Sequence, residues 1–132
     1  MNDFTKKDME EARLAIASMI KRTEDAKEKF AEGTSQHTLL TNRLKALNIA
    51  SSLILKECAE SNDIDHYAKK ELEKALAPIA SLISKSEKAQ SKVAQGTWQH
   101  TMLSNNLKAL YIASPILKKT LNEISTGKEN IE

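Results

Sequence analysis

The sequence feature that most constrains the fold is an internal repeat. When the chain is shifted by 63 residues, residues 4–60 align with residues 67–123 without a gap, and 28 of the 57 aligned pairs are identical. Unrelated sequences would share about three or four pairs. The clearest match runs from Gly33 to Leu47 and from Gly96 to Leu110. We infer a tandem gene duplication, because two copies of this length are too few and too long for a solenoid.

Each copy predicts two helices. Apolar residues recur in steps of three and four, which places them on one face of a helix, first before a glycine and again after it. Gly33 and Gly96 follow the first helix of each copy, where glycine relieves left-handed backbone strain. Thr34 and Thr97 are predicted to cap the second helix. A link this short predicts an antiparallel helical hairpin in each copy.

Four helices of roughly 25–28 residues predict an all-α fold, an up-down-up-down four-helix bundle built from two tandem duplicated αα-hairpins. We expect a single domain over residues 1–132, with a short link at 61–65 and a frayed tail at 125–132. In such a bundle both glycine turns lie at the same end. The low content of breakers and of aromatic residues (three glycines, two prolines, 4% aromatic) also argues against strands.

The second helix of each copy is more apolar than an ordinary bundle helix needs to be. Besides the stripe that faces its hairpin partner, it carries a second stripe. The positions are Leu39, Ala46, Ile49, Ala50 and Leu53 in the first copy and Met102, Ala109, Ile112, Ala113 and Ile116 in the second, and all but the alanines Ala50 and Ala113 are candidate interface residues. Either these two helices pack on each other in the centre of the bundle, or the second stripe is an oligomer interface. We favour self-association as a two-fold dimer.

The start of each second helix is the best candidate for a ligand site. The residues are Thr34, Gln36 and His37 in the first copy and Thr97, Gln99 and His100 in the second. A helix N-terminus is electropositive, so a small anion or a carboxylate can bind there. We favour the simpler interpretation that these residues cap the helix and close the bundle end. Trp98, beside the second cap, either covers the end of the core, which we favour, or anchors a partner.

No catalytic or metal-binding pattern is visible. The sequence contains no Gly-rich phosphate loop, no Gly-x-Ser-x-Gly turn, no His-Glu-x-x-His and no Glu-x-x-His pair of the di-iron bundles. Zinc needs three or four ligands, and the positions predicted to face the two tip histidines carry Phe30 and Val93. We therefore expect no enzyme activity, no metal and no cofactor.

Charge is divided unequally between the two copies. The net charge of +2 is the sum of −1 over residues 1–63 and +3 over residues 64–132. The second hairpin thus carries a mild basic face, although nucleic acid footprints are usually more basic. No signal sequence or membrane span is visible, and Cys58 is predicted to be a buried, inert thiol. We expect a cytoplasmic protein without membrane contact.

These patterns predict a non-enzymatic protein–protein interaction or regulatory module, which self-associates through the second helix of each copy. A nucleic-acid-associated regulator that uses the basic second hairpin is one alternative. A small-ligand binder at the His/Gln hairpin tips is the other.

Overall fold

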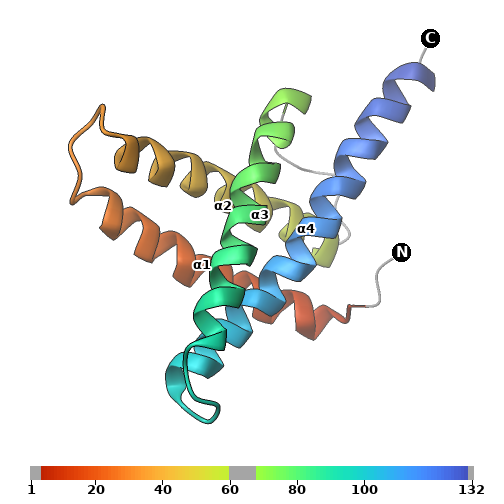
Figure 1. Cartoon of the computed structure of the whole chain (residues 1–132). Helices are drawn as coiled ribbons and strands as arrows, with labels where there is room; N and C mark the ends of the chain where they lie inside the picture. Colours follow the sequence, from red (N-terminus) through yellow and green to blue (C-terminus); the bar gives the residue numbers. More distant parts are fainter. Residues whose placement is uncertain (1–3, 60–67, 131–132) are drawn as a thin grey trace.

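The computed structural model describes residues 4–59 and 68–130, with side chains placed over 4–57 and 68–124. This described part consists of four helices and contains no strand (Figure 1). The helices are α1 (Lys6–Lys27), α2 (Ser35–Ala59), α3 (Lys69–Ser91) and α4 (Trp98–Asn130). The predicted all-α fold is confirmed. None of these helices is both long enough and apolar enough to cross a membrane.

Two predictions for chain segments fall at the limits of this description. The Cys58 side chain and the link at 61–65 lie outside the described residues. At the other end, α4 continues to Asn130, into the segment that was predicted as a tail. The only breaker in that segment is Gly127, and one glycine costs a helix only about 1 kcal/mol.

Local hydrogen bonds set the start of α1 and α3. The Asp8 N–H donates to Thr5 Oγ1 at 3.0 Å and the Thr5 N–H donates to Asp8 Oδ2 at 3.1 Å, which forms a capping box. Ala68, the counterpart of Thr5, has no side-chain acceptor, so α3 begins with half of this arrangement: the Ala68 N–H donates to Glu71 Oε1 at 3.0 Å. The 63-residue shift therefore pairs residues that start equivalent helices.

The hairpin turns are longer than the sequence predicted. α1 and α3 end several residues before the glycines, so residues 28–34 and 92–97 form the turns. Gly33 and Gly96 have φ angles of 91° and 89°, in the left-handed region that favours glycine. Left-handed glycines are thus confirmed, but the prediction that they directly follow the helix is wrong. Just after the last helical turn, backbone N–H groups donate to the carbonyl oxygen three residues earlier instead of four. These bonds tighten the chain and end the α-helix before the glycine.

The two hairpins form a four-helix bundle in which they pack across each other. α1 contacts α2 and α4, α3 contacts α4 and α2, and α2 contacts α4 across the centre. Within the described part, α1 and α3 do not pack against each other. Because the hairpins cross, the α1–α2 turn and the α3–α4 turn lie on different sides of the molecule (Figure 1). The expectation that both turns share one end is therefore wrong.

The second apolar stripe of α2 and α4 explains the crossing. Six of its candidate interface residues are at most 6% exposed, namely Ala46, Ile49, Leu53, Ala109, Ile112 and Ile116. They belong to one core cluster that also contains Ile16 of α1 and Ile79 of α3. When the hairpins cross, α2 and α4 lie in the centre. One apolar stripe of each packs against the other helix of its own hairpin, and the second stripe packs against the opposite hairpin. Central packing of α2 and α4 thus explains why these six positions are apolar.

Candidate functional site

The threonines at the hairpin turns act as helix caps. The His37 N–H donates to Thr34 Oγ1 at 3.2 Å, and the His100 N–H donates to Thr97 Oγ1 at 3.2 Å. Each threonine hydroxyl also donates to a carbonyl oxygen three residues earlier, inside the turn. The predicted caps are confirmed, and these hydroxyls are engaged within the chain.

The structure does not bring the two sets of tip residues together. His37 and His100 are half-buried and Gln36 and Gln99 are exposed, but the turns that carry them lie on different sides of the molecule (Figure 1). Each set would have to bind a ligand by itself. In the described ranges, no three His, Cys, Asp or Glu side chains gather in a way that would hold a metal ion.

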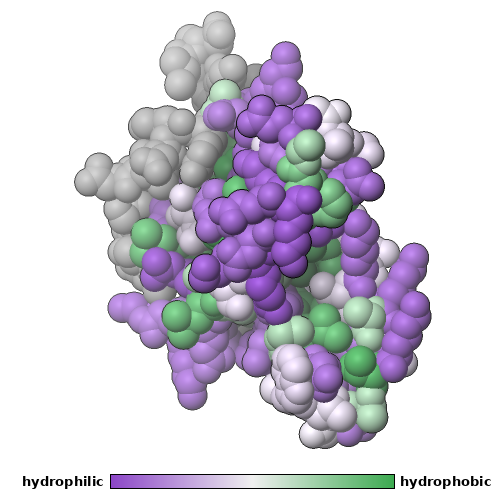
Figure 2. All heavy atoms as spheres, turned by 90° about the vertical axis from the view of Figure 1, so that its left-hand side faces the viewer, coloured by the Kyte–Doolittle hydropathy of each residue, from purple (hydrophilic) through white to green (hydrophobic). Residues whose placement is uncertain are grey.

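Three of the nine residues predicted as an interface reach the surface. The other six belong to the buried part of the second stripe. Leu39 is 47% exposed, Trp98 is 71% exposed and Met102 is half-buried. On the side of the molecule that carries the α1–α2 turn, hydrophobic residues form separate patches between hydrophilic ones (Figure 2). A partner surface on this chain would have to use such exposed residues.

Two grooves run between the hairpins. The α1–α4 groove has a volume of about 710 Å³, and its walls include Leu14, Ala15 and Arg22 of α1 and Trp98, Met102 and Lys108 of α4. The α2–α3 groove has a volume of about 1010 Å³, and its walls include Leu39, Arg43 and Lys45 of α2 and Glu71, Lys74 and Pro78 of α3. The 63-residue shift maps one groove onto the other, with Lys45 on Lys108 and Ala15 on Pro78. The two grooves are therefore equivalent places in the fold.

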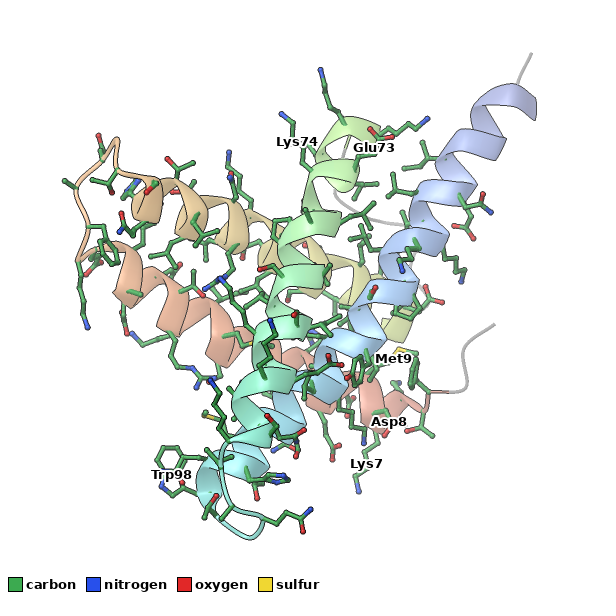
Figure 3. The ribbon with its side chains drawn as sticks, in the orientation of Figure 1. Lys7, Asp8, Met9, Glu73, Lys74 and Trp98 are labelled. Atoms are coloured by element: carbon green, nitrogen blue, oxygen red, sulfur yellow. The ribbon has the colours of Figure 1, made fainter. Side chains whose placement is uncertain are left out.

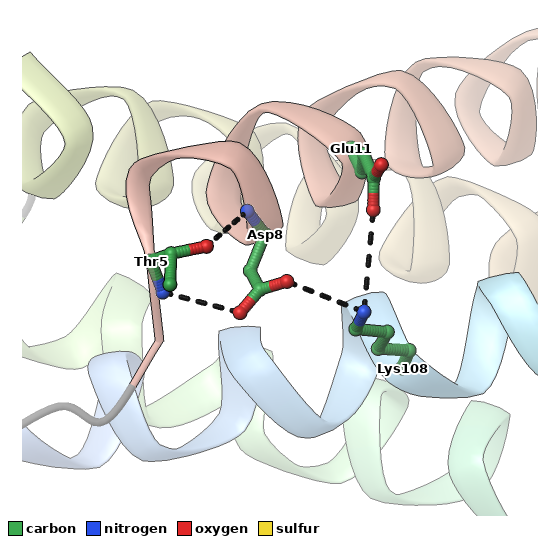
Figure 4. A network of polar contacts seen from close by, with 4 residues as sticks. All are labelled: Thr5, Asp8, Glu11 and Lys108. Atoms are coloured by element: carbon green, nitrogen blue, oxygen red, sulfur yellow. Dashed lines mark hydrogen bonds and ion pairs between the residues drawn. The ribbon is translucent and has the colours of Figure 1, made fainter.

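In the α1–α4 groove, Lys108 is paired with two carboxylates of the same chain. Lys108 Nζ lies 3.3 Å from Asp8 Oδ1 and 4.0 Å from Glu11 Oε1, and thus joins α4 to α1 (Figure 4). The backbone N–H of Thr5 and, after it, the Lys108 ammonium hold the pKa of Asp8 below its usual value. At this end of the α1–α4 groove, the positive charge of Lys108 is therefore neutralised by carboxylates of the same chain.

In the α2–α3 groove, two equivalent positions carry different charges. Lys74 stands where the other groove has Glu11, and Arg43 stands where it has Asn106. Both changes add positive charge. The aligned copies showed these differences, but the sequence alone could not place them in one groove, because helical periodicity does not reveal how the hairpins cross.

The cations of the α2–α3 groove are not paired within the described part of the chain. Arg43, Lys45 and Lys74 make no hydrogen bond or ion pair there. Glu71, the acid that lines this groove, accepts from the Ala68 N–H at 3.0 Å. Partial burial lowers the pKa of the Arg43 guanidinium from its usual value. This groove therefore presents a net positive charge, with three cations that are unpaired in the described residues against the single carboxylate of Glu71.

Two large apolar side chains are exposed on the α1–α4 groove. Trp98 is 71% exposed and Leu14 is 73% exposed. Figure 3 shows Trp98 projecting away from the ribbon at the α3–α4 turn. Beside it, Arg22 Nη1 donates to Met102 Sδ at 2.8 Å. The prediction that Trp98 covers the end of the core is wrong, because most of its side chain is exposed at the start of α4.

The basic face predicted on the second hairpin is partly neutralised by the first hairpin. Lys108 is paired as described, and Lys119 Nζ lies 3.0 Å from Glu57 Oε2. The hydrogen bond to Glu57 raises the pKa of Lys119. Within the second hairpin, the Tyr111 hydroxyl donates to Glu87, which raises the pKa of Tyr111. Each of these pairs joins two helices of the bundle, so these side chains are engaged within the chain.

Comparisons of the chain with protein-family profiles, with curated protein sequences and with solved structures found no match. The candidate site therefore rests on geometry. It consists of two equivalent grooves, one bordered by exposed Trp98 and Leu14, the other by three cations that form no ion pair in the described residues.

Proposed function

We propose that the chain is a non-enzymatic interaction module that self-associates through the rim of the α1–α4 groove. The supporting observation is the exposure of Trp98 and Leu14 on the walls of the same groove. Exposed apolar residues that gather at a hollow are typical of binding surfaces. Tryptophan is also enriched among the residues that dominate the energy of protein interfaces. This surface replaces the second stripe, most of which is buried.

A two-fold dimer suits this surface because it uses each contact twice. Burying one tryptophan removes up to roughly 150–250 Å² of surface from water. At about 25 cal/mol per Å², each indole contributes up to roughly 4–6 kcal/mol. Two of them offset much of the cost of association, which is about 4–15 kcal/mol. A cytoplasmic location is part of the same proposal, since a single cysteine cannot form a disulfide within the chain.

The test replaces Trp98 with serine, the residue at the equivalent position of the first copy, Ser35. We expect the wild-type chain to dimerise in a dilution series. The Trp98→Ser variant should dissociate with a constant at least about thirtyfold higher, which corresponds to at least about 2 kcal/mol for an interface anchor. Gel filtration coupled to light scattering measures both masses.

Leu55→Lys is the matched control, because Leu55 is exposed, lines neither groove and aligns with Lys118. This variant should dimerise like the wild type. Trp98 is the only tryptophan, so the fluorescence of the wild type should shift to shorter wavelength as concentration rises. A mass of 14.7 kDa at every concentration, with constant emission, would refute self-association.

A further inference from the structure

The two grooves share a framework but differ in charge. Among the residues that line the α1–α4 groove, two carboxylates balance two cations. In the α2–α3 groove, Glu71 stands against Arg43, Lys45 and Lys74, so three cations minus one carboxylate leave a net charge of +2. None of the three cations has a partner within the described ranges, whereas Lys108 of the other groove has two carboxylates within 4.0 Å. The α2–α3 groove is thus complementary to an anionic ligand.

Arg43 is the residue that most clearly lacks a counter-charge. It is half-buried on the wall of the groove, and the same burial lowers its pKa. A charge that is partly removed from water carries a free-energy cost unless it is paired. A guanidinium binds a carboxylate through two parallel hydrogen bonds, so an incoming acid would relieve this cost. Lys45 on the same helix and Lys74 on the facing helix supply charge on both walls.

The shape of the groove favours a helix as the ligand. Its floor contains the small buried side chains of Ala46 and Ala75, and exposed Leu39 and half-buried Pro78 add apolar surface. From Leu39 to Ile49, α2 advances by about 15 Å, or roughly three helical turns. Small-molecule pockets enclose most of their ligand, whereas this hollow is a trench with exposed walls at Leu39, Lys45 and Lys74. An amphipathic helix commonly lies in a groove of this kind.

Nucleic acid fits this groove less well. Its lining contains one acid and no aromatic residue on which a base can stack. Three cations also make a small phosphate footprint. The apolar floor would remain without a partner if only phosphates were bound.

We propose that the α2–α3 groove binds an acidic amphipathic helix of a partner protein. Its carboxylates pair with Arg43, Lys45 and Lys74, and its apolar side chains contact Leu39 and Pro78. This site is separate from the Trp98 surface, which belongs to the other groove, so the chain carries one surface for self-association and another for a different protein.

The test uses a library of random peptides of about 16 residues, displayed on phage and selected on the full-length protein. The comparison protein carries Arg43→Asn and Lys74→Glu, which install the residues that the other groove has at these positions. We expect the wild type to enrich acidic peptides with apolar residues at helical spacing. The dissociation constant of a synthetic peptide from this set, measured by fluorescence anisotropy, should rise at least about tenfold in the double variant.

Lys88→Glu with Lys92→Asn is the matched control, because it makes the same change in net charge at two exposed lysines outside the groove. This control and Trp98→Ser should both leave peptide binding unchanged. If circular dichroism shows that Arg43→Asn disturbs folding, Lys74→Glu alone carries the test, since Lys74 is exposed.

Three results would overturn the proposal. The library enriches no acidic peptides, or the selected peptides bind the wild type and the double variant equally. Alternatively, a single-stranded RNA of about 20 nucleotides binds the wild type and is lost in the double variant while no peptide does so, which assigns the groove to nucleic acid.

Discussion

At the scale of single residues, the two copies agree in the core and differ on the groove walls. Ile16 and Ile79 are equivalent and both buried, as are Leu47 and Leu110. By contrast, Glu11 is exchanged for Lys74 at equivalent places on a groove wall. Packing constrains the first kind of position, because a core residue touches many neighbours. The wall positions are free of that constraint, and we propose that their differences distinguish what the two grooves bind.

Asp8 provides a pH-dependent test of the paired groove. The Thr5 N–H and then Lys108 stabilise its charged form and hold its pKa below the usual 3.8. A lowered pKa stabilises the fold above that usual value, and the stabilisation is lost as pH falls through the lowered pKa. Asp8→Asn should therefore lower Tm near neutral pH, and the difference from the wild type should close below pH 3.8. Thermal unfolding followed by circular dichroism across this range measures it.

Glu10→Gln is the control for Asp8→Asn. Glu10 is an exposed carboxylate on the same helix and makes no hydrogen bond or ion pair within the described residues. Its Tm should differ little from that of the wild type at any pH. A deficit in Asp8→Asn that persists unchanged in acid would show that the charge of Asp8 has no part in the effect.

At the scale of helices, the sequence predicted the features that are determined by residues close together in the chain. The four helices, the caps at Thr34 and Thr97 and the left-handed glycines depend on spacing and on hydrogen bonds within one turn. The crossing of the hairpins and the outward direction of Trp98 depend on residues that are distant in sequence. The wide apolar arc of α2 and α4 left two explanations open, because a buried stripe and an interface stripe have the same periodicity.

Ile112 separates these two explanations by experiment. It is 0% exposed, so Ile112→Ala should remove packing from the core and lower the free energy of unfolding by about 2–5 kcal/mol. Leu39→Ala, at an exposed position of the same predicted interface, should change it by less than about 0.5 kcal/mol. Urea unfolding measures both variants. If Ile112→Ala kept full stability and only weakened association, the stripe would be an interface after all.

At the scale of the whole molecule, each hairpin packs against its equivalent. α1 lies on α4 as α3 lies on α2, and α2 meets α4 at the centre. A dimer of two identical hairpins would have the same arrangement, with two identical grooves. The sequence identity between the copies and this equivalence of contacts together support our proposal that the chain arose by duplication of a self-associating hairpin.

The isolated first half, residues 1–63, should therefore form a homodimer. At the end of each groove that lies away from Arg22, Asp8 and Glu11 of one copy would face Arg43 and Lys45 of the other, so two carboxylates face two cations there. Such pairs add attraction to the burial of the shared core. Sedimentation equilibrium should give the mass of two copies, with helical content close to that of this half in the whole chain.

The isolated second half, residues 64–132, should dimerise more weakly. Each of its grooves would combine Glu71 and Lys74 of one copy with Lys108 of the other, so two cations share one carboxylate. Because salt screens this repulsion, its dimer should tighten as ionic strength rises, whereas the dimer of the first half should not. Lys74→Glu should strengthen the dimer of the second half and remove its response to salt. Equal dimer affinities for the two halves at low salt would show that the groove charges do not control how the hairpins pair.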